Sequence, residues 1–324
     1  MTSFVSTLAS AGTKMESTLD VSFAEWAMLG GLVVVMLVVD LLLFGRGKRE
    51  LRLRESVVWS IAWLLLALGF GVVMLVWQGS TAGSEYFAGY LLERSLSLDN
   101  IFVFAVLFGY FAVPLAVQPR VLAWGIMLAL VLRLVFILIG AALLDSFHFT
   151  FYLFGALLLY TAWKLGTHSG GEMDPEHNTA LKIVRKRVPM TKEYHGPALT
   201  VKQGGRRIAT PLIAVFVVVA TTDIIFAIDS IPAIFAITTE PFIVFAANAF
   251  AMLGLRALYF ALVGLMDRFV YLSQGLSLVL AFIGVKMLLI DVWHPPIWVS
   301  LVVIVVVLTA TAVLSVKRPP KAAT

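Results

Sequence analysis

One eight-residue pattern occurs twice in this chain, first as Glu93-Arg94-Ser95-Leu96-Ser97-Leu98-Asp99-Asn100 and again as Asp223-Ile224-Ile225-Phe226-Ala227-Ile228-Asp229-Ser230. Each copy begins with an acid, has a second acid six residues later, and ends with a small amide or hydroxyl side chain. Both copies lie inside apolar segments long enough to cross a bilayer, where an ionisable side chain costs at least about 2.5–3.5 kcal/mol. Acids in such a place indicate a functional site.

The composition of the 324-residue chain is that of a membrane protein. Hydrophobic residues make up 60% of it, charged residues only 13%, and the mean hydropathy is +0.97. The basic residues, which give a formal net charge of +5, cluster in a few loops beside apolar segments, as in positive-inside membrane proteins. Nucleic acid is therefore not an expected partner. Cysteine is absent, which excludes disulfides and thiolate metal sites within these residues.

The apolar segments predict an all-α polytopic membrane protein, because about 20 apolar residues span a bilayer. About nine spans are expected, at residues 26–44, 57–77, 86–110, 121–144, 149–166, 210–237, 242–265, 272–290 and 297–316. The loop after the first span is strongly basic, so we expect it in the cytoplasm, with the N-terminus outside and the C-terminus inside. The first 25 residues are polar and lack the apolar core of a cleavable signal peptide.

The two copies of the pattern belong to a longer internal repeat. An offset of 130 residues aligns Glu93 with Asp223, Asp99 with Asp229, and Asn100 with Ser230. Further along, Arg133 corresponds to Arg256, and Lys164 to Lys286. Each repeat holds three spans, an odd number, so the second repeat enters the membrane in the opposite orientation. Inverted repeats of this kind are typical of secondary transporters, whose sites lie near the bilayer midplane at the repeat interface.

This repeat predicts seven segments along the chain. They are an extracytoplasmic polar N-terminus (1–25), two peripheral helices (26–77), repeat 1 (86–166), a basic cytoplasmic loop (167–209), repeat 2 (210–290), a final helix (297–316) and a cytoplasmic tail (317–324). The 167–209 loop is expected to be a solvated linker that sets the orientation of the chain in the membrane. The alternative is that it binds anionic lipid headgroups.

Helix geometry limits how the four acids can act. A six-residue step in a straight helix rises about 9 Å and turns by about 240°, so Glu93 and Asp99 cannot bind one small ion from an unbroken helix. Because the third and sixth spans are predicted to be antiparallel, we expect Glu93 at the depth of Asp229 and Asp99 at the depth of Asp223. The alternatives are two cross-helix acidic pairs, or one site if a helix unwinds. Pro232 favours unwinding, because it lacks an N–H donor and its ring crowds the carbonyl four residues earlier.

Carboxylate, amide and hydroxyl oxygens suit a hard divalent cation such as Mg²⁺, Ca²⁺ or Mn²⁺. The predicted metal ligands are Glu93, Asp99, Asn100, Asp223, Asp229, Ser230 and Asp40. For Asp40, in the first span, a proton relay or a helix-packing role is the alternative. Arg133 and Arg256 lie near mid-span and are expected either to neutralise the acids when no ion is bound or to form permanent ion pairs.

Residues 93–100 and the stretch Asp229-Ser230-Ile231-Pro232-Ala233 resemble the two signature motifs of the TerC family of integral membrane proteins, and the whole pattern looks most like its pH-inducible Alx branch. The likeness extends from about residue 26 to residue 316. It implies inverted three-helix repeats and a role in manganese homeostasis, chiefly Mn²⁺ export. Two positions depart from the family pattern. Arg94 replaces a common Lys, and Ala220 stands where a Glu usually precedes the sixth-span Asp by three residues, so one potential oxygen ligand is missing.

The sequence therefore predicts a secondary transporter, not an enzyme, that exports Mn²⁺ across the bacterial cytoplasmic (inner) membrane. The transported ion and the lipid bilayer are the expected partners, Ca²⁺ is a possible second cargo, and no further cofactor is expected. Two other classes stay open. One is a membrane-assembly or partner-binding protein without transport, and the other is an intramembrane aspartyl protease that uses Asp99 and Asp229.

Overall fold

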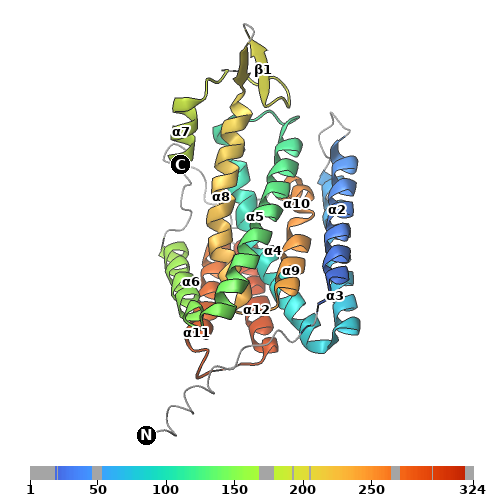
Figure 1. The fold of residues 1–324 in the computed structure, drawn as a ribbon, viewed down its shortest axis with the longest axis vertical. Coiled ribbons are helices and arrows are strands. Elements are labelled where there is room, and N and C mark those ends of the chain that lie inside the picture. Colours follow the sequence, from blue (N-terminus) through green and yellow to red (C-terminus); the bar gives the residue numbers. More distant parts are fainter. Residues whose placement is uncertain are drawn as a thin grey trace.

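The computed structural model describes residues 19, 21–45, 53–167, 179–191, 193–203, 206–263, 271–293 and 295–317. Over these residues the chain is a bundle of helices with one small two-stranded sheet (Figure 1). The helices are α2 (Phe23–Gly45), α3 (Leu53–Trp77), α4 (Gly79–Tyr110), α5 (Gln118–Ser146), α6 (Phe149–Thr167), α7 (Thr179–Arg187), α8 (Pro211–Phe235), α9 (Pro241–Met252), α10 (Leu255–Leu262), α11 (Leu272–Leu288) and α12 (Ile297–Lys317). The strands, β1 (Thr200–Gln203) and β2 (Arg206–Ala209), pair in antiparallel register.

Several helices have the length and composition of membrane spans. Within the described ranges, α2, α3, α5, α8 and α12 each meet this test, and α9 and α10 meet it together as a pair bent by 41°. A bilayer favours helices because every backbone polar group must be paired within the segment that crosses it. The chain is therefore a polytopic helical membrane protein. The other long helices are less apolar or shorter: α4 carries four charged residues, and α11 has 17 residues.

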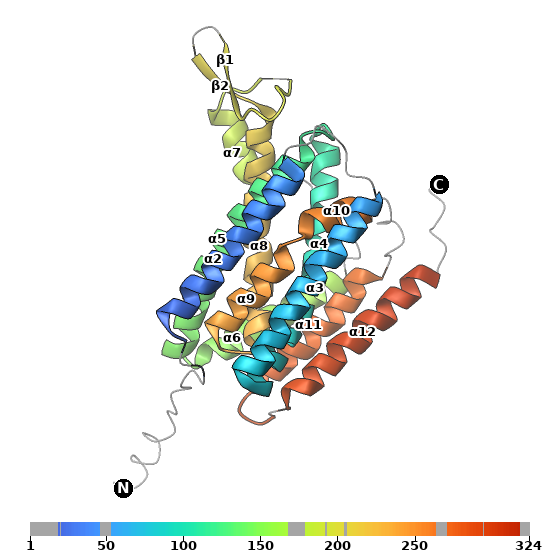
Figure 2. The same ribbon diagram turned by 90° about the vertical axis from the view of Figure 1, so that its right-hand side faces the viewer.

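The central helices pack in an ordered way. Helix α4 lies along α9 and α8, α5 lies along α8 and α9, and α6 lies along α11. Helix α9 is the most enclosed, because every residue from Phe242 to Met252 is buried. A helix that is apolar all round is expected to be buried in this way. Helix α7 lies beside the end of α8 at which that helix begins, and the sheet lies beyond this end of the bundle (Figures 1 and 2).

The predicted span 242–265 corresponds to two helices joined by a bend. Helix α9 ends at Met252 and α10 begins at Leu255, and Figure 2 shows the change of direction between them. Gly254 makes the turn with a φ of +81°, in the left-handed region that favours glycine. A Cβ at this position would lie 2.7 Å from the Cβ of Trp63, so α3 approaches the turn too closely for any other residue.

Of the two alternatives for the acids, the one in which the helix unwinds at Pro232 is not found. Helix α8 is continuous from Pro211 to Phe235 and contains Pro232 in its last turn. A proline this close to a helix end removes one hydrogen bond without interrupting the turns on either side.

Two predicted loops are more ordered than expected. Gln78 alone separates α3 from α4, because Gly79, with a φ of +93°, turns the chain directly into the next helix. The predicted linker 167–209 contains α7 and the β1–β2 hairpin. Tyr194 ties this segment to the bundle, since its hydroxyl donates to the carbonyl of Phe111 over 2.6 Å.

Some predictions concern residues outside the described ranges. These are most of the polar N-terminus (1–25), the basic residues Arg46, Lys48, Arg49 and Arg52 of the first loop, and most of the tail (318–324).

Candidate metal site

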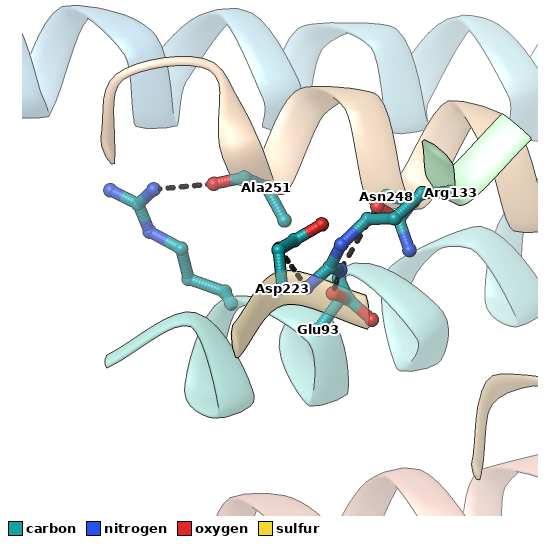
Figure 3. A network of polar contacts seen from close by, with 6 residues as sticks. Glu93, Arg133, Asp223, Asn248 and Ala251 are labelled. Carbon is teal, nitrogen blue, oxygen red and sulfur yellow. Dashed lines mark hydrogen bonds and ion pairs between the residues drawn. The ribbon is translucent and has the colours of Figure 1, made fainter. Parts of the chain in front are cut away.

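An arginine joins the first acids of the two repeated stretches. The side chain of Arg133, on α5, is 1% exposed, and its Nη1 forms an ion pair with Oε1 of Glu93 on α4. Nη2 of the same side chain lies 3.7 Å from Oδ1 of Asp223 on α8. Figure 3 shows the guanidinium directed at both carboxylates. One buried cation therefore lies between acids that are 130 positions apart in the sequence.

A neutral amide completes the surroundings of this arginine. Nη1 of Arg133 donates to Oδ1 of Asn248 on α9 over 3.1 Å, and Asn248 is fully buried (Figure 3). The guanidinium thus contacts three helices besides its own: α4, α8 and α9. We refer to Glu93, Arg133, Asp223 and Asn248 as the Arg133 centre.

The Arg133 centre and the helices α4 and α8 that carry its two acids contain buried oxygens with no hydrogen-bond partner among the described residues. These oxygens are Oε2 of Glu93, Oγ of Ser97, Oδ2 of Asp223 and Oγ of Ser230. A buried polar atom without a partner costs about 1–3 kcal/mol, so such atoms are uncommon in folded proteins. A hard cation takes oxygen ligands of these types, and the donor set therefore fits one.

A small hollow opens beside Asp223, between α4 and α8. Its lining residues are Asn100, Val103, Phe104, Leu107, Val219, Thr222, Asp223 and Phe226. It has room for a body about the size of one water molecule. Two of the predicted ligands, Asn100 and Asp223, therefore face the same space from different helices.

Asp229 lies in a different environment from Asp223. Its Oδ1 accepts a hydrogen bond of 2.8 Å from the hydroxyl of Thr161 on α6, and its side chain is half-buried. Because six residues along a continuous helix turn it by about 240°, Asp229 points to another side of α8. The predicted pairing of Glu93 with Asp229 is wrong, since Arg133 joins Glu93 to Asp223 instead.

Asp99 lies within α4, but its side chain is outside the described part of the structure. Among the side chains that are described, no three His, Cys, Asp or Glu residues lie together as a metal-binding group. The described side-chain oxygens that line the hollow come from one carboxylate (Asp223), one amide (Asn100) and one hydroxyl (Thr222).

Arg94, the residue next to Glu93, holds the end of α9. Its Nη1 donates to the carbonyl of Ala251 over 2.8 Å, a contact drawn as a dashed line in Figure 3. The last four carbonyls of a helix have no partner within it, and a cation is favourable there. Both long side chains near the acids of α4, Arg94 and Arg133, therefore bond to α9.

Comparison with known proteins decides the family. The sequence model described as "Integral membrane protein TerC family" matches residues 78–322. The chain belongs to the TerC family. This TerC protein is 43% identical to an uncharacterized membrane protein of Myxococcus xanthus, over 92% of this chain and 94% of that one. It is 42% identical to Alx of Salmonella typhi and 40% identical to Alx of Escherichia coli K12, each over 90% of this chain and 93% of the relative. Both relatives are named as proposed membrane-bound redox modulators. No solved structure matches.

The second predicted counter-ion of the TerC protein, Arg256 on α10, pairs with Asp40 on α2. Nη2 of Arg256 lies 2.7 Å from Oδ2 of Asp40 and also donates to the backbone carbonyl of the same residue. Nη1 donates to the carbonyl of Pro119 over 3.4 Å. The first turn of α10 is thereby fixed to α2 and to the start of α5, just beyond the bend at Gly254.

Sequence reasoning missed three polar residues of the TerC site. Ser97 lies one turn after Glu93, so the i, i+4 spacing could have placed it on the same face of α4. Asn248 is the only amide in the apolar run 242–253, a weaker signal. Thr161 is one of many threonines near apolar segments, and nothing in the sequence connects it to Asp229.

Proposed function

We propose that this TerC protein is a secondary transporter that exports Mn²⁺, or a similar hard divalent cation such as Ca²⁺, across the bacterial cytoplasmic membrane. One observation carries the proposal. Two buried carboxylates from different helices, Glu93 and Asp223, flank Arg133, and each keeps an oxygen without a hydrogen-bond partner among the described residues; a small hollow opens beside Asp223. Asn100 and Ser230 would add an amide and a hydroxyl oxygen. Asp99 and Asp229 are the remaining proposed carboxylate ligands, reached as the ion moves along α4 and α8.

Charge explains how this centre could bind and release an ion. With both carboxylates ionised, Glu93 and Asp223 contribute −2 and Arg133 contributes +1, which leaves a buried net charge of −1. A dication 4 Å from the guanidinium would be repelled by roughly 8 kcal/mol at an effective dielectric constant of about 20. Binding therefore requires Arg133 to move away from the carboxylates. Its return would bring the net charge of the empty centre from −2 back to −1 and favour release of the ion.

We further propose nine spans in two inverted three-helix repeats, with α9 and α10 forming one broken span. The packing supports this arrangement: under the predicted repeat, α4, α5 and α6 correspond to α8, α9–α10 and α11. The contact of α4 with α9 then corresponds to that of α8 with α5, and both contacts are present. The proposed orientation places the N-terminus outside and the C-terminus in the cytoplasm.

Asp40 is left out of the proposed ligand set, because Arg256 occupies it. We propose that this pair holds α2 against α10, so that the broken span keeps its bend. Arg133 is then the counter-ion of the transport site, and Arg256 has a structural role.

Mn²⁺ flux into liposomes that contain the purified protein tests the function. Asp223→Asn is expected to abolish flux, and Asp99→Ala and Asp229→Ala to reduce it strongly. Asp145→Asn is the matched control, because Asp145 is exposed at the end of α5. Undiminished flux in the Asp223→Asn protein would rule out the assigned site, and no flux in the unmodified protein would rule out the function.

The names of the Alx relatives favour redox modulation as a second candidate function. These 324 residues contain no cysteine, so thiol–disulfide exchange cannot be carried by this chain's own side chains. The test is the ratio of oxidised to reduced thiols in cells lacking the protein. If this ratio is altered, and the alteration persists when Mn²⁺ is removed from the medium, the redox role is favoured over transport.

A further inference from the structure

Asn248 has surroundings that a purely structural amide would not have. It is the buried polar residue of α9, and its Oδ1 accepts a hydrogen bond from Nη1 of Arg133. Its Nδ2 is buried and has no hydrogen-bond partner among the described residues. A buried amide group without a partner costs free energy, so Asn248 is not explained by helix packing alone.

The guanidinium of Arg133 contacts two kinds of acceptor, charged carboxylates and a neutral amide. Nη1 contacts both Glu93 and Asn248, whereas Nη2 points toward Asp223 at 3.7 Å. The acceptors on α4 and α8 are the proposed ligands of the transported ion. Asn248 lies on α9 and has no charge. It is therefore the acceptor that a cation at the carboxylates would leave available to Arg133.

Building on the proposed function, we propose that Asn248 is a positioning residue that holds Arg133 away from Glu93 and Asp223 when the divalent cation is bound. The strength of its bond to Arg133 then sets the affinity of the site for the ion. A stronger acceptor in place of Asn248 should draw the guanidinium of Arg133 away from the carboxylates of Glu93 and Asp223. Without an acceptor there, the guanidinium should stay bound to these carboxylates.

This role predicts changes of opposite sign from two substitutions of similar size. Asn248→Asp supplies a charged acceptor for Arg133, and the dissociation constant for Mn²⁺ is expected to fall about tenfold. Asn248→Leu removes the acceptor, and the dissociation constant is expected to rise about tenfold. Both constants are measured by calorimetric titration of the purified full-length protein with MnCl₂, alongside melting temperatures without metal.

A double-mutant cycle tests whether Asn248 acts through Arg133. In an Arg133→Met background, Asn248→Leu is expected to leave the dissociation constant for Mn²⁺ unchanged, because the side chain that it positions is gone. The same tenfold effect in that background would show that Asn248 acts on the ion directly, and would overturn the proposal.

The outcomes separate this inference from the function on which it rests. If the unmodified protein binds no Mn²⁺, the transport proposal fails and this inference fails with it. If the unmodified protein binds Mn²⁺ and both Asn248 substitutions weaken binding, or neither changes it, transport stands and the positioning role is wrong. Lower melting temperatures with unchanged dissociation constants would likewise assign Asn248 to packing alone.

Discussion

Arg133 forms an ion pair with Glu93 in which both side chains are excluded from solvent, with exposed fractions of 1% and 0%. The same guanidinium lies 3.7 Å from Asp223, so one positive charge lies between the leading acids of both repeated stretches. Removing one member of a buried ion pair typically costs 3–5 kcal/mol, because the other charge is left without a partner. The centre is therefore held together by a charge that, in the proposed function, must be displaced for a cation to bind.

Replacing Arg133 is expected to have opposite effects on stability and on binding. Arg133→Met should lower the free energy of unfolding by about 3–5 kcal/mol in the absence of metal. The same variant should bind Mn²⁺ more tightly, because the competing charge is gone, and MnCl₂ should restore its melting temperature. Thermal unfolding in detergent, with and without MnCl₂, measures both effects. Weaker Mn²⁺ binding in this variant would mean that Arg133 assists binding and does not compete with the ion.

The Asp40–Arg256 pair is expected to affect stability and to leave Mn²⁺ affinity unchanged. Arg256→Met alone should destabilise the protein by about 3–5 kcal/mol, and adding Asp40→Leu should recover much of that loss, because no buried charge is then left unpaired. The melting temperatures of the three proteins test this order. A changed dissociation constant for Mn²⁺ in the double variant would place Asp40 among the ligands after all.

Gly254→Ala is expected to damage the bend between α9 and α10. The φ of +81° disfavours any residue with a Cβ by about 1–2 kcal/mol, and the new atom would lie 2.7 Å from Trp63. We expect a clear fall in melting temperature and reduced Mn²⁺ flux. Gly69→Ala is the control, because a Cβ there meets nothing within 4 Å. Equal melting temperatures for both variants would show that the bend does not depend on glycine.

The absence of cysteine makes the proposed orientation easy to test by single-cysteine labelling. A cysteine at Lys202, in the hairpin, should react with an impermeant maleimide only when the cytoplasmic face is accessible. A cysteine at Asp145, at the opposite end of the bundle, should react in intact spheroplasts. Both original side chains are exposed. Labelling of both positions from one side would contradict the odd number of spans between them.

The sequence predicted the participants in the site better than their arrangement. Acids and arginines are conspicuous in apolar segments, so Glu93, Asp223 and Arg133 could be identified without a structure. Their pairing depends on how α4, α5 and α8 are rotated and shifted against one another, and a shift of one turn changes which acid meets Arg133. That is why Asp229, expected opposite Glu93, lies against Thr161 instead.

The positions of the helices were also predictable from a conspicuous sequence pattern. The prediction missed features that depend on contacts between residues distant in sequence. Long apolar runs identified the helices, but the bend at Gly254 depends on the close approach of Trp63, which is distant in sequence. Asn248 was missed because a neutral amide in an apolar helix costs far less than a charge and carries no pairing signal.

In the proposed function, Glu93 and Asp223 bind one cation between α4 and α8. Titration of the purified protein with Mn²⁺, followed by the electron paramagnetic resonance signal of the free ion, tests it most directly. The account predicts stoichiometric binding by the unmodified protein and by the Asp145→Asn control, and a dissociation constant at least about tenfold higher for Glu93→Gln and for Asp223→Asn, because each removes a charged ligand. Equal affinity in all four proteins would contradict it.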